Sequence, residues 1–232
     1  MMNHDNLQRL VTEFLKENQV WNRAISLDIE ADLRILDDPK KIILSISTAR
    51  RHEGKIDIQK FVLNDETLEE EEKIFNEFAS FCARSKPLVF IGYNIMRFDL
   101  PVLVLKMRQL DEKFKKSGKY QPEYWAFREA LGRSYFLDMI DPIRFEIAKY
   151  DNVSPKFISL ENAISHKRFS HISFMRTKNI VSNITNNSTT NKWDTIYNLW
   201  KSNRESFNKY IEGDVHDTLL LAEELFNIKS TI

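Results

Sequence analysis

The spacing of apolar residues changes several times along this chain. In segment 6–16, Leu7, Leu10 and Phe14 recur at the helical period, whereas segment 24–29 is a nearly continuous apolar run that is typical of a buried strand. Apolar spacing predicts helices at 6–16, 64–84, 101–110, 121–131, 142–149, 159–165 and 204–226, the first within an N-terminal helical region at 1–20. Strands are predicted at 24–30, 42–49, 55–63, 87–91 and 135–140.

Two turn signals separate the first three strands. Asp37-Asp38-Pro39 follows the first strand, and Glu53-Gly54 stands between the second and the third. The sheet is therefore expected to begin with an antiparallel meander. Thr67 is the expected N-cap of the next helix, and the acidic run 69–72 is interpreted as its solvated first turn.

Segment 182–192 interrupts the alternation. It is rich in Asn, Ser and Thr and has no apolar period, so a flexible loop is expected there. Cations and aromatic residues flank it, and these could pair with phosphates and stack on the bases of a single strand, although an ordinary surface segment has the same composition. They are Lys167, Arg168, Phe169, His171, Phe174, Arg176 and Lys178.

Composition limits the classes of fold and partner. The 232 residues, 42% of them hydrophobic, suffice for a single α/β domain that spans 1–232. Lys+Arg and Asp+Glu each number 34, so no net charge attracts the chain to nucleic acid or to an acidic membrane surface. The single cysteine, Cys82, excludes an internal disulfide and a cysteine-based zinc site. The chain begins with no apolar signal region, and no run reaches membrane-spanning length, so a cytoplasmic protein with no membrane partner is expected.

Two carboxylates lie in the first predicted strand. Asp28 and Glu30 are two residues apart, so they share one face while Leu27 and Ile29 share the other. Their repulsion is removed when a cation lies between them, and oxygen ligands alone suit Mg²⁺ or Mn²⁺ rather than zinc. The alternative is the solvated face of an edge strand.

A second set of polar residues follows the strand at 87–91. Asn94 and Asp99 lie between that strand and a helix opened by Pro101, at the carboxyl end of a strand, where open α/β sheets bind ligands. Alternatively, Asp99 caps the helix and Asn94 only makes the turn. Asp138 and Asp141 are rival carboxylates, but Asp141 is interpreted as the cap of the helix that starts at Pro142.

The last predicted helix carries Tyr210 and Asp214. They are four residues apart, so a phenol and a carboxylate lie together beside a buried stripe, where the carboxylate needs a partner or a metal. Asp217 lies near the same face, and Glu212 points elsewhere. Taken alone, this pair could also be a solvated helix edge.

The order of these three motifs resembles the tyrosine-bearing branch of the DEDD exonucleases (DEDDy), and in particular the proofreading exonuclease domain of family-B DNA polymerases and its stand-alone relatives. The matching residues are Asp28, Glu30, Asn94, Phe98, Asp99, Tyr210 and Asp214. A weaker match is Ser159-Leu160-Glu161-Asn162-Ala163. Lys209 stands where the histidine-bearing branch has its base, so that branch is disfavoured.

The resemblance implies a ribonuclease H-like fold: a mixed five-stranded sheet, with an antiparallel meander joined to parallel strands, flanked by helices. It also implies two Mg²⁺ or Mn²⁺ ions held by four acids, with Asp28 as the bridging ligand. Tyr210 is expected to orient the attacking water, while Asn94 and Phe98 position the terminal nucleotide. The four acids are Asp28, Glu30, Asp99 and Asp214.

The function expected from the resemblance is 3′-5′ hydrolysis of single-stranded DNA to nucleoside 5′-monophosphates. No polymerase domain follows Ile232, so a stand-alone enzyme is expected, with a DNA replication or repair protein as a candidate partner. Two alternatives remain at this point. One is an RNA 3′-5′ exonuclease of the same fold, and the other is a non-catalytic module that binds nucleic acid or protein.

Overall fold

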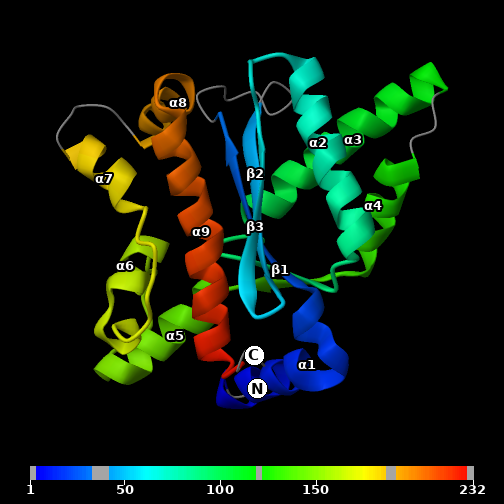
Figure 1. Cartoon of the computed structure of the whole chain (residues 1–232). Helices are drawn as coiled ribbons and strands as arrows, with labels where there is room; N and C mark the ends of the chain where they lie inside the picture. Colours follow the sequence, from blue (N-terminus) through cyan, green and yellow to red (C-terminus); the bar gives the residue numbers. More distant parts are fainter. Residues whose placement is uncertain (1–3, 33–41, 119–121, 187–191, 229–232) are drawn as a thin grey trace.

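The sheet has five strands in the order β3-β2-β1-β4-β5 (Figure 1). The protein is described by a computed structural model that covers residues 4–32, 42–118, 122–186 and 192–228. The strands are β1 (Ala24–Ala31), β2 (Ile43–His52), β3 (Lys55–Val62), β4 (Val89–Gly92) and β5 (Tyr135–Asp138). β1, β2 and β3 pair antiparallel, and β4 and β5 extend the sheet by parallel pairing. The mixed five-stranded α/β sheet expected from the sequence is confirmed.

A two-residue turn closes the β2–β3 hairpin. Glu53 and Gly54 have φ angles of 49° and 76°, and His52 pairs with Lys55. Positive φ at both central residues is the geometry of a type I′ turn, whose twist matches that of the strands. The predicted meander is therefore present, while the turn expected at 37–39 lies outside the described residues.

Helices cover both faces of the sheet. α2 packs against β2 and β3 on one face with α4 beside it, and α9 crosses β1 to β4 on the other face (Figure 1). The helices are α1 (His4–Lys16), α2 (Leu68–Ser85), α3 (Asp99–Ser117), α4 (Pro122–Arg133), α5 (Ile140–Asp151), α6 (Leu160–Ser165), α7 (Asn179–Asn186), α8 (Lys192–Ser202) and α9 (Arg204–Leu225), with short 3₁₀ helices at Glu17–Arg23 and Lys167–Phe169. None of the helices in the described part of the chain is long and apolar enough to span a membrane.

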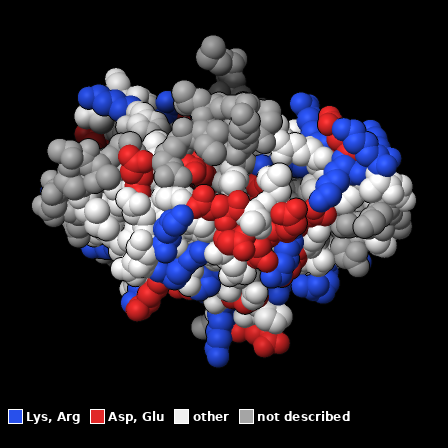
Figure 2. Space-filling model, turned by 90° about the horizontal axis from the view of Figure 1, so that it is seen from above, with Lys and Arg blue, Asp and Glu red and all other residues white. Residues whose placement is uncertain are grey.

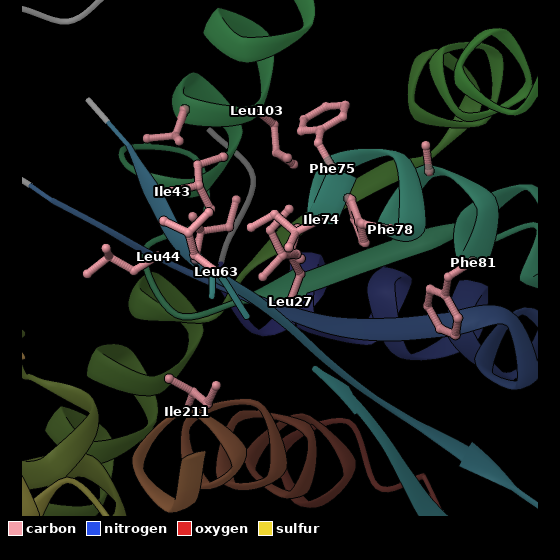
Figure 3. Close-up of a cluster of buried hydrophobic side chains, with 14 of the residues drawn as sticks. Leu27, Ile43, Leu44, Leu63, Ile74, Phe75, Phe78, Phe81, Leu103 and Ile211 are labelled. Atoms are coloured by element: carbon pink, nitrogen blue, oxygen red, sulfur yellow. The ribbon is translucent and has the colours of Figure 1, made fainter. Parts of the chain in front are cut away.

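The main core lies between the sheet and α2. Figure 3 shows Leu27 of β1 among Ile74, Phe75 and Phe78 of α2, with Ile211 of α9 on the opposite side of the sheet. Because side chains alternate along a strand, packing Leu27 and its neighbours against α2 turns the other face of β1 toward α9.

The structure differs in part from two sequence interpretations. The acidic start of α2 is not wholly solvated, because Glu71 is buried, accepts a hydrogen bond from the Ile43 backbone N–H at 2.7 Å and pairs with Lys106. Residues 182–186 of the segment expected to be a loop belong to helix α7, and α8 begins at Lys192, whereas 187–191 lie outside the described residues. Ile180 and Ile184 are four residues apart, a helical spacing that the polar composition obscured.

Candidate metal and nuclease site

Asp28 and Glu30 lie on a central strand of the sheet. β1 pairs with β2 on one side and β4 on the other, so the alternative of a solvated edge strand is wrong. Their antiparallel partners in β2 are Ser47 and Ser45, whose small side chains leave room on the face of the sheet that α9 crosses. The sequence places the carboxylates opposite the buried Leu27, which fixes them on that face.

Helix α9 brings Tyr210 and Asp214 to the same face. Both side chains are buried, and Tyr210 shares a side-chain hydrogen bond with Glu30. Carboxylate oxygens of Asp28, Glu30 and Asp214 all lie within 4.8 Å of one another. Two strand residues and a residue nearly two hundred positions later in the chain thus form one acidic cluster.

Asp99 approaches the cluster from the start of α3. Its Oδ1 accepts a hydrogen bond from the Ile29 backbone N–H at 2.7 Å, which anchors the carboxylate between Asp28 and Glu30 along β1. It lies outside the three-acid group whose oxygens meet within 4.8 Å, but it lines the same cavity of about 550 Å³ as Asp28 and Glu30. Asn94, Phe98 and Tyr210 line that cavity as well.

The loop between β4 and α3 is held by Asp138 at the end of β5. Asp138 accepts hydrogen bonds from the backbone N–H groups of Asn94 at 3.1 Å, Met96 at 3.2 Å and Ile140 at 3.0 Å. Asp138 therefore organises the loop and the start of α5. Capping of that helix by Asp141 is wrong, because α5 begins at Ile140 and Asp141 pairs with Arg144 inside the first turn.

Asn94 and Gly92 shape the same loop. Asn94 has a φ of 77°, a left-handed conformation that Asn tolerates better than most residues, and its carbonyl accepts from the Phe98 N–H. A Cβ at Gly92 would meet the Ile95 Cβ at 2.6 Å, so only glycine permits the close return of the chain after β4. These constraints direct Asn94 and Phe98 toward the cavity.

Lys178 lies against the acidic cluster, a position that was not predicted from the sequence. Its ammonium donates hydrogen bonds to the Tyr210 hydroxyl at 2.8 Å and to the Asp214 carboxylate, and it lies 4.5 Å from the centre of the Tyr210 ring. The preceding segment is fixed to α9, because Asp217 accepts from the backbone N–H groups of Met175 and Arg176. Nothing local in the sequence distinguishes Lys178 from its neighbouring cations.

Gly213 permits this close packing on α9. A Cβ there would meet the Thr177 side chain at 1.7 Å, and Thr177 itself donates to the Tyr210 carbonyl at 3.2 Å. Other members of the cationic and aromatic segment have structural roles. Arg168 pairs with Glu146 and Glu224, and Phe169 is fully buried, so neither is free to hold a strand.

Burial and mutual repulsion make the acids weak. Desolvation and the charge of Asp28 raise the pKa of Glu30 to about 7, and desolvation raises the pKa of Asp214 to about 8 against the opposing charge of Lys178. The pKa of Asp99 is raised well above its ordinary value by burial and by Asp28. Burial opposes the charge of Lys178, but Asp214, Asp28 and Glu30 outweigh it and raise the lysine pKa. Lys178 therefore only partly neutralises the cluster.

The donor set fits divalent cations that prefer oxygen. Asp28 Oδ2 and Asp214 Oδ1 are buried and find no hydrogen-bond partner among the described residues. Buried carboxylate oxygens without partners are costly, and a hard ion such as Mg²⁺ or Mn²⁺ relieves that cost through oxygen ligands. Asp28, Glu30 and Asp214 could hold such an ion, with Asp99 beside them.

The free energy of unfolding of the metal-free protein, measured in a chelator, should depend on pH. Glu30 and Asp214 keep protons in the folded state, with pKa values of about 7 and about 8, that ordinary carboxyls in the unfolded chain have already released. The stability that these two protonated groups contribute is therefore fully present below the ordinary carboxyl pKa and is lost as the pH rises through these folded-state values. Between pH 6 and pH 8 the expected loss is on the order of 3 kcal/mol. Urea unfolding in EDTA at both pH values measures it, and Asp214→Asn should reduce the difference; an unchanged difference in that variant would contradict the assignment.

Acidic side chains gather near the middle of the molecular face seen in Figure 2, with Lys and Arg side chains around them. The formal net charge of 0 thus conceals a local separation of sign. An acidic surface repels a phosphate backbone, so binding a polyanion near it requires added cations.

Comparisons with known proteins show which family the chain is similar to. Residues 15–134 match the model of the exonuclease domain of family-B DNA polymerases, a region that contains Asp28, Glu30 and Asp99 but not Tyr210 or Asp214. The chain is 32% identical over 105 residues to the DNA polymerase delta catalytic subunit of Dictyostelium discoideum, which covers 38% of this chain and 9% of that protein.

The fold is also similar to a solved structure. The family-B DNA polymerase of the hyperthermophilic archaeon Pyrobaculum calidifontis superposes with a TM-score of 0.54 and 17% identity over 87% of this chain and 24% of the polymerase. This chain thus spans a small part of each relative. From the matched region and the shared fold, the chain belongs to the family of exonuclease domains of family-B DNA polymerases.

Proposed function

We propose that this chain by itself is a metal-dependent 3′-5′ exonuclease that releases nucleoside 5′-monophosphates from single-stranded DNA. The observation that carries the proposal is the meeting of Asp28, Glu30 and Asp214 beside an open cavity, with two buried carboxylate oxygens lacking partners among the described residues. Family membership favours the same chemistry.

The proposed ligands are the four acids of the site. Two Mg²⁺ or Mn²⁺ ions would be bound. Asp28 would be a ligand of both, Glu30 and Asp214 would be ligands of the first, and Asp99 would be a ligand of the second. Such a pair of ions supplies an activated water on one side of the scissile phosphate and stabilises the leaving 3′ oxygen on the other. The cavity residues Asn94 and Phe98 would place the terminal nucleotide against these acids.

Tyr210 would orient the attacking water rather than remove its proton. Burial and the charge of Glu30 raise the pKa of Tyr210 well above its ordinary value, so the phenol keeps its proton at neutral pH. Because Lys178 donates to the Tyr210 oxygen, the phenolic hydrogen is left to point toward an acceptor such as Glu30 or a water. Lys178 would therefore position Tyr210 and Asp214.

The test is an assay with 5′-labelled single-stranded DNA and RNA of the same sequence, with Mg²⁺, Mn²⁺ or EDTA. The expected result is a ladder of products shortened from the 3′ end of DNA, present with either metal and lost in EDTA. Blocking the 3′ end should protect the strand, whereas blocking the 5′ end should not.

Three other results would contradict the proposal. Cleavage in EDTA would remove the role of metal, and degradation of RNA alone would make the chain a ribonuclease. Binding without shortening of either strand would make it a non-catalytic module. If the isolated chain is active, a replication or repair protein remains a candidate partner that would deliver the strand.

A further inference from the structure

Two exposed aromatic side chains line the cavity outside the acids. Phe157 is 70% exposed and Trp193 is 37% exposed, and both line the cavity that contains Asp28 and Phe98. Aromatic side chains left in water forgo a large burial free energy, so two of them lining the cavity that contains the acids are a candidate binding surface.

Trp193 continues an aromatic surface that begins at Phe98. The two ring centres lie 6.4 Å apart at an angle of 24°, close to parallel, and Phe98 is the more buried ring. On α8, Trp193 precedes Tyr197 and Trp200 at the spacing of one helix face, but those two are buried. The aromatic stripe of α8 therefore emerges from the core at Trp193.

The chain next to Phe157 is anchored by hydrogen bonds, whereas the Phe157 ring is exposed. The Tyr93 hydroxyl donates to the carbonyl of Ile158 at 2.7 Å, which ties the segment to the end of β4. Ser159 then caps α6 by accepting from the Asn162 N–H at 3.3 Å. A well-anchored segment that presents an unburied phenyl ring to the cavity is suited to contact a ligand rather than to complete the core.

Positive charge accompanies this aromatic surface. The Lys192 ammonium lies 5.4 Å from the centre of the Trp193 ring, and Lys192 lines the cavity. Aromatic rings for bases with an adjacent cation for phosphates are the combination with which proteins hold single strands without reading their sequence. A paired base has both faces stacked inside a duplex, so a surface of this kind would accept unpaired nucleotides only.

We propose that Trp193 and Phe157 stack on the unpaired bases just upstream of the terminal nucleotide, which Phe98 would hold. The inference rests on the proposed exonuclease function and defines its substrate as a single strand of several nucleotides, bound with little preference among bases. Neither residue belongs to the three acidic motifs. Their proposed role is to bind and position the substrate, not to take part in the hydrolysis.

The test compares Trp193→Ala and Phe157→Ala with Trp125→Ala. Trp125 on α4 has the same 37% exposure as Trp193 but does not line the cavity, which makes it a matched control. Two readouts are used: the steady-state kinetics of hydrolysis of a dT₁₀ oligonucleotide with Mn²⁺, and the Kd of a dT₁₀ oligonucleotide whose 3′ linkages are phosphorothioates that resist hydrolysis.

Each cavity substitution is expected to raise KM and Kd about tenfold, with a smaller change in kcat. Trp193→Phe should restore most of the affinity, because stacking requires an aromatic face rather than the indole N–H. Trp125→Ala should behave as the wild type.

The outcomes separate this inference from the proposed function. If the wild type hydrolyses dT₁₀ and the three alanine variants are equivalent, the inference is overturned and the exonuclease function stands. If nothing is hydrolysed but Trp193→Ala and Phe157→Ala still weaken binding of the phosphorothioate strand, the exonuclease function fails and the stacking surface stands. If the wild type binds neither strand, both fail.

Discussion

Replacing Asp28 with asparagine is expected to lower the rate of nucleotide release by about 1,000-fold or more. Asparagine keeps the shape of the side chain but removes the charge that the cluster offers to cations. Asp28 interacts electrostatically with all three other acids of the site, since its charge raises the pKa of Glu30, Asp99 and Asp214. Its loss should therefore leave no position at which both ions are held.

The Asp28→Asn variant should fold and should be at least as stable as the wild type. Burial raises the pKa of Asp28 itself, so its charge costs free energy in the folded chain without metal, and removing it should leave the thermal stability in EDTA unchanged or higher. The matched control is Glu212→Gln, a carboxylate on α9 that pairs with Lys60 instead of the cluster. Asp28→Asn with near-normal activity would contradict the assignment of the site.

Replacing Lys106 with methionine is expected to lower the free energy of unfolding by about 3–5 kcal/mol. Lys106 of α3 and Glu71 of α2 are both nearly fully buried and pair at 2.9 Å, and Glu71 also accepts from the Ile43 N–H. Methionine preserves most of the volume, so the main effect is a buried carboxylate left without its cation. Guanidinium unfolding monitored by circular dichroism measures the change.

A double variant identifies the cause. Glu71→Gln combined with Lys106→Met should recover most of the lost stability, because the amide oxygen of glutamine can still accept from Ile43 and carries no charge. Lys113→Met is the control, since Lys113 pairs with Glu72 across the same two helices but is exposed, and its loss should cost less than about 1 kcal/mol. Equal losses for Lys106→Met and Lys113→Met would show that burial does not decide the effect.

Local patterns in the sequence determine much of this fold. The alternation around Leu27 and Asp28 predicts which face of β1 packs in the apolar core under α2 and which carries the acids. Thr67 caps α2, as expected, by accepting from the Glu70 N–H. The carboxylates of β1 and the Tyr210 and Asp214 pair were likewise visible as faces of single elements. That they would meet in space was predicted only from the family resemblance, because no local pattern specifies how the last helix packs on the first strand.

The features that the sequence did not predict depend on contacts between distant segments. Nothing in the local sequence separates Lys178 from the other nearby cations. Contacts of its segment with α9, namely the backbone hydrogen bonds to Asp217 and the packing of Thr177 against Gly213, bring Lys178 into the cluster. Glu71 is indistinguishable from the solvated glutamates around it until α3 places Lys106 beside it. Helix α7 was obscured because its polar residues are typical of loops, although Ile180 and Ile184 keep the helical spacing.

The measurement that tests the central claim most directly is a Mn²⁺ titration of the metal-free protein, with free Mn²⁺ followed by electron paramagnetic resonance. With a nucleoside 5′-monophosphate present, the wild type is expected to bind two ions. Asp28→Asn should lose this binding, whereas Glu212→Gln should keep it. Equal binding by Asp28→Asn and the wild type would mean that the acids of β1 and α9 do not form a metal site, and the proposed nuclease would lose its physical basis.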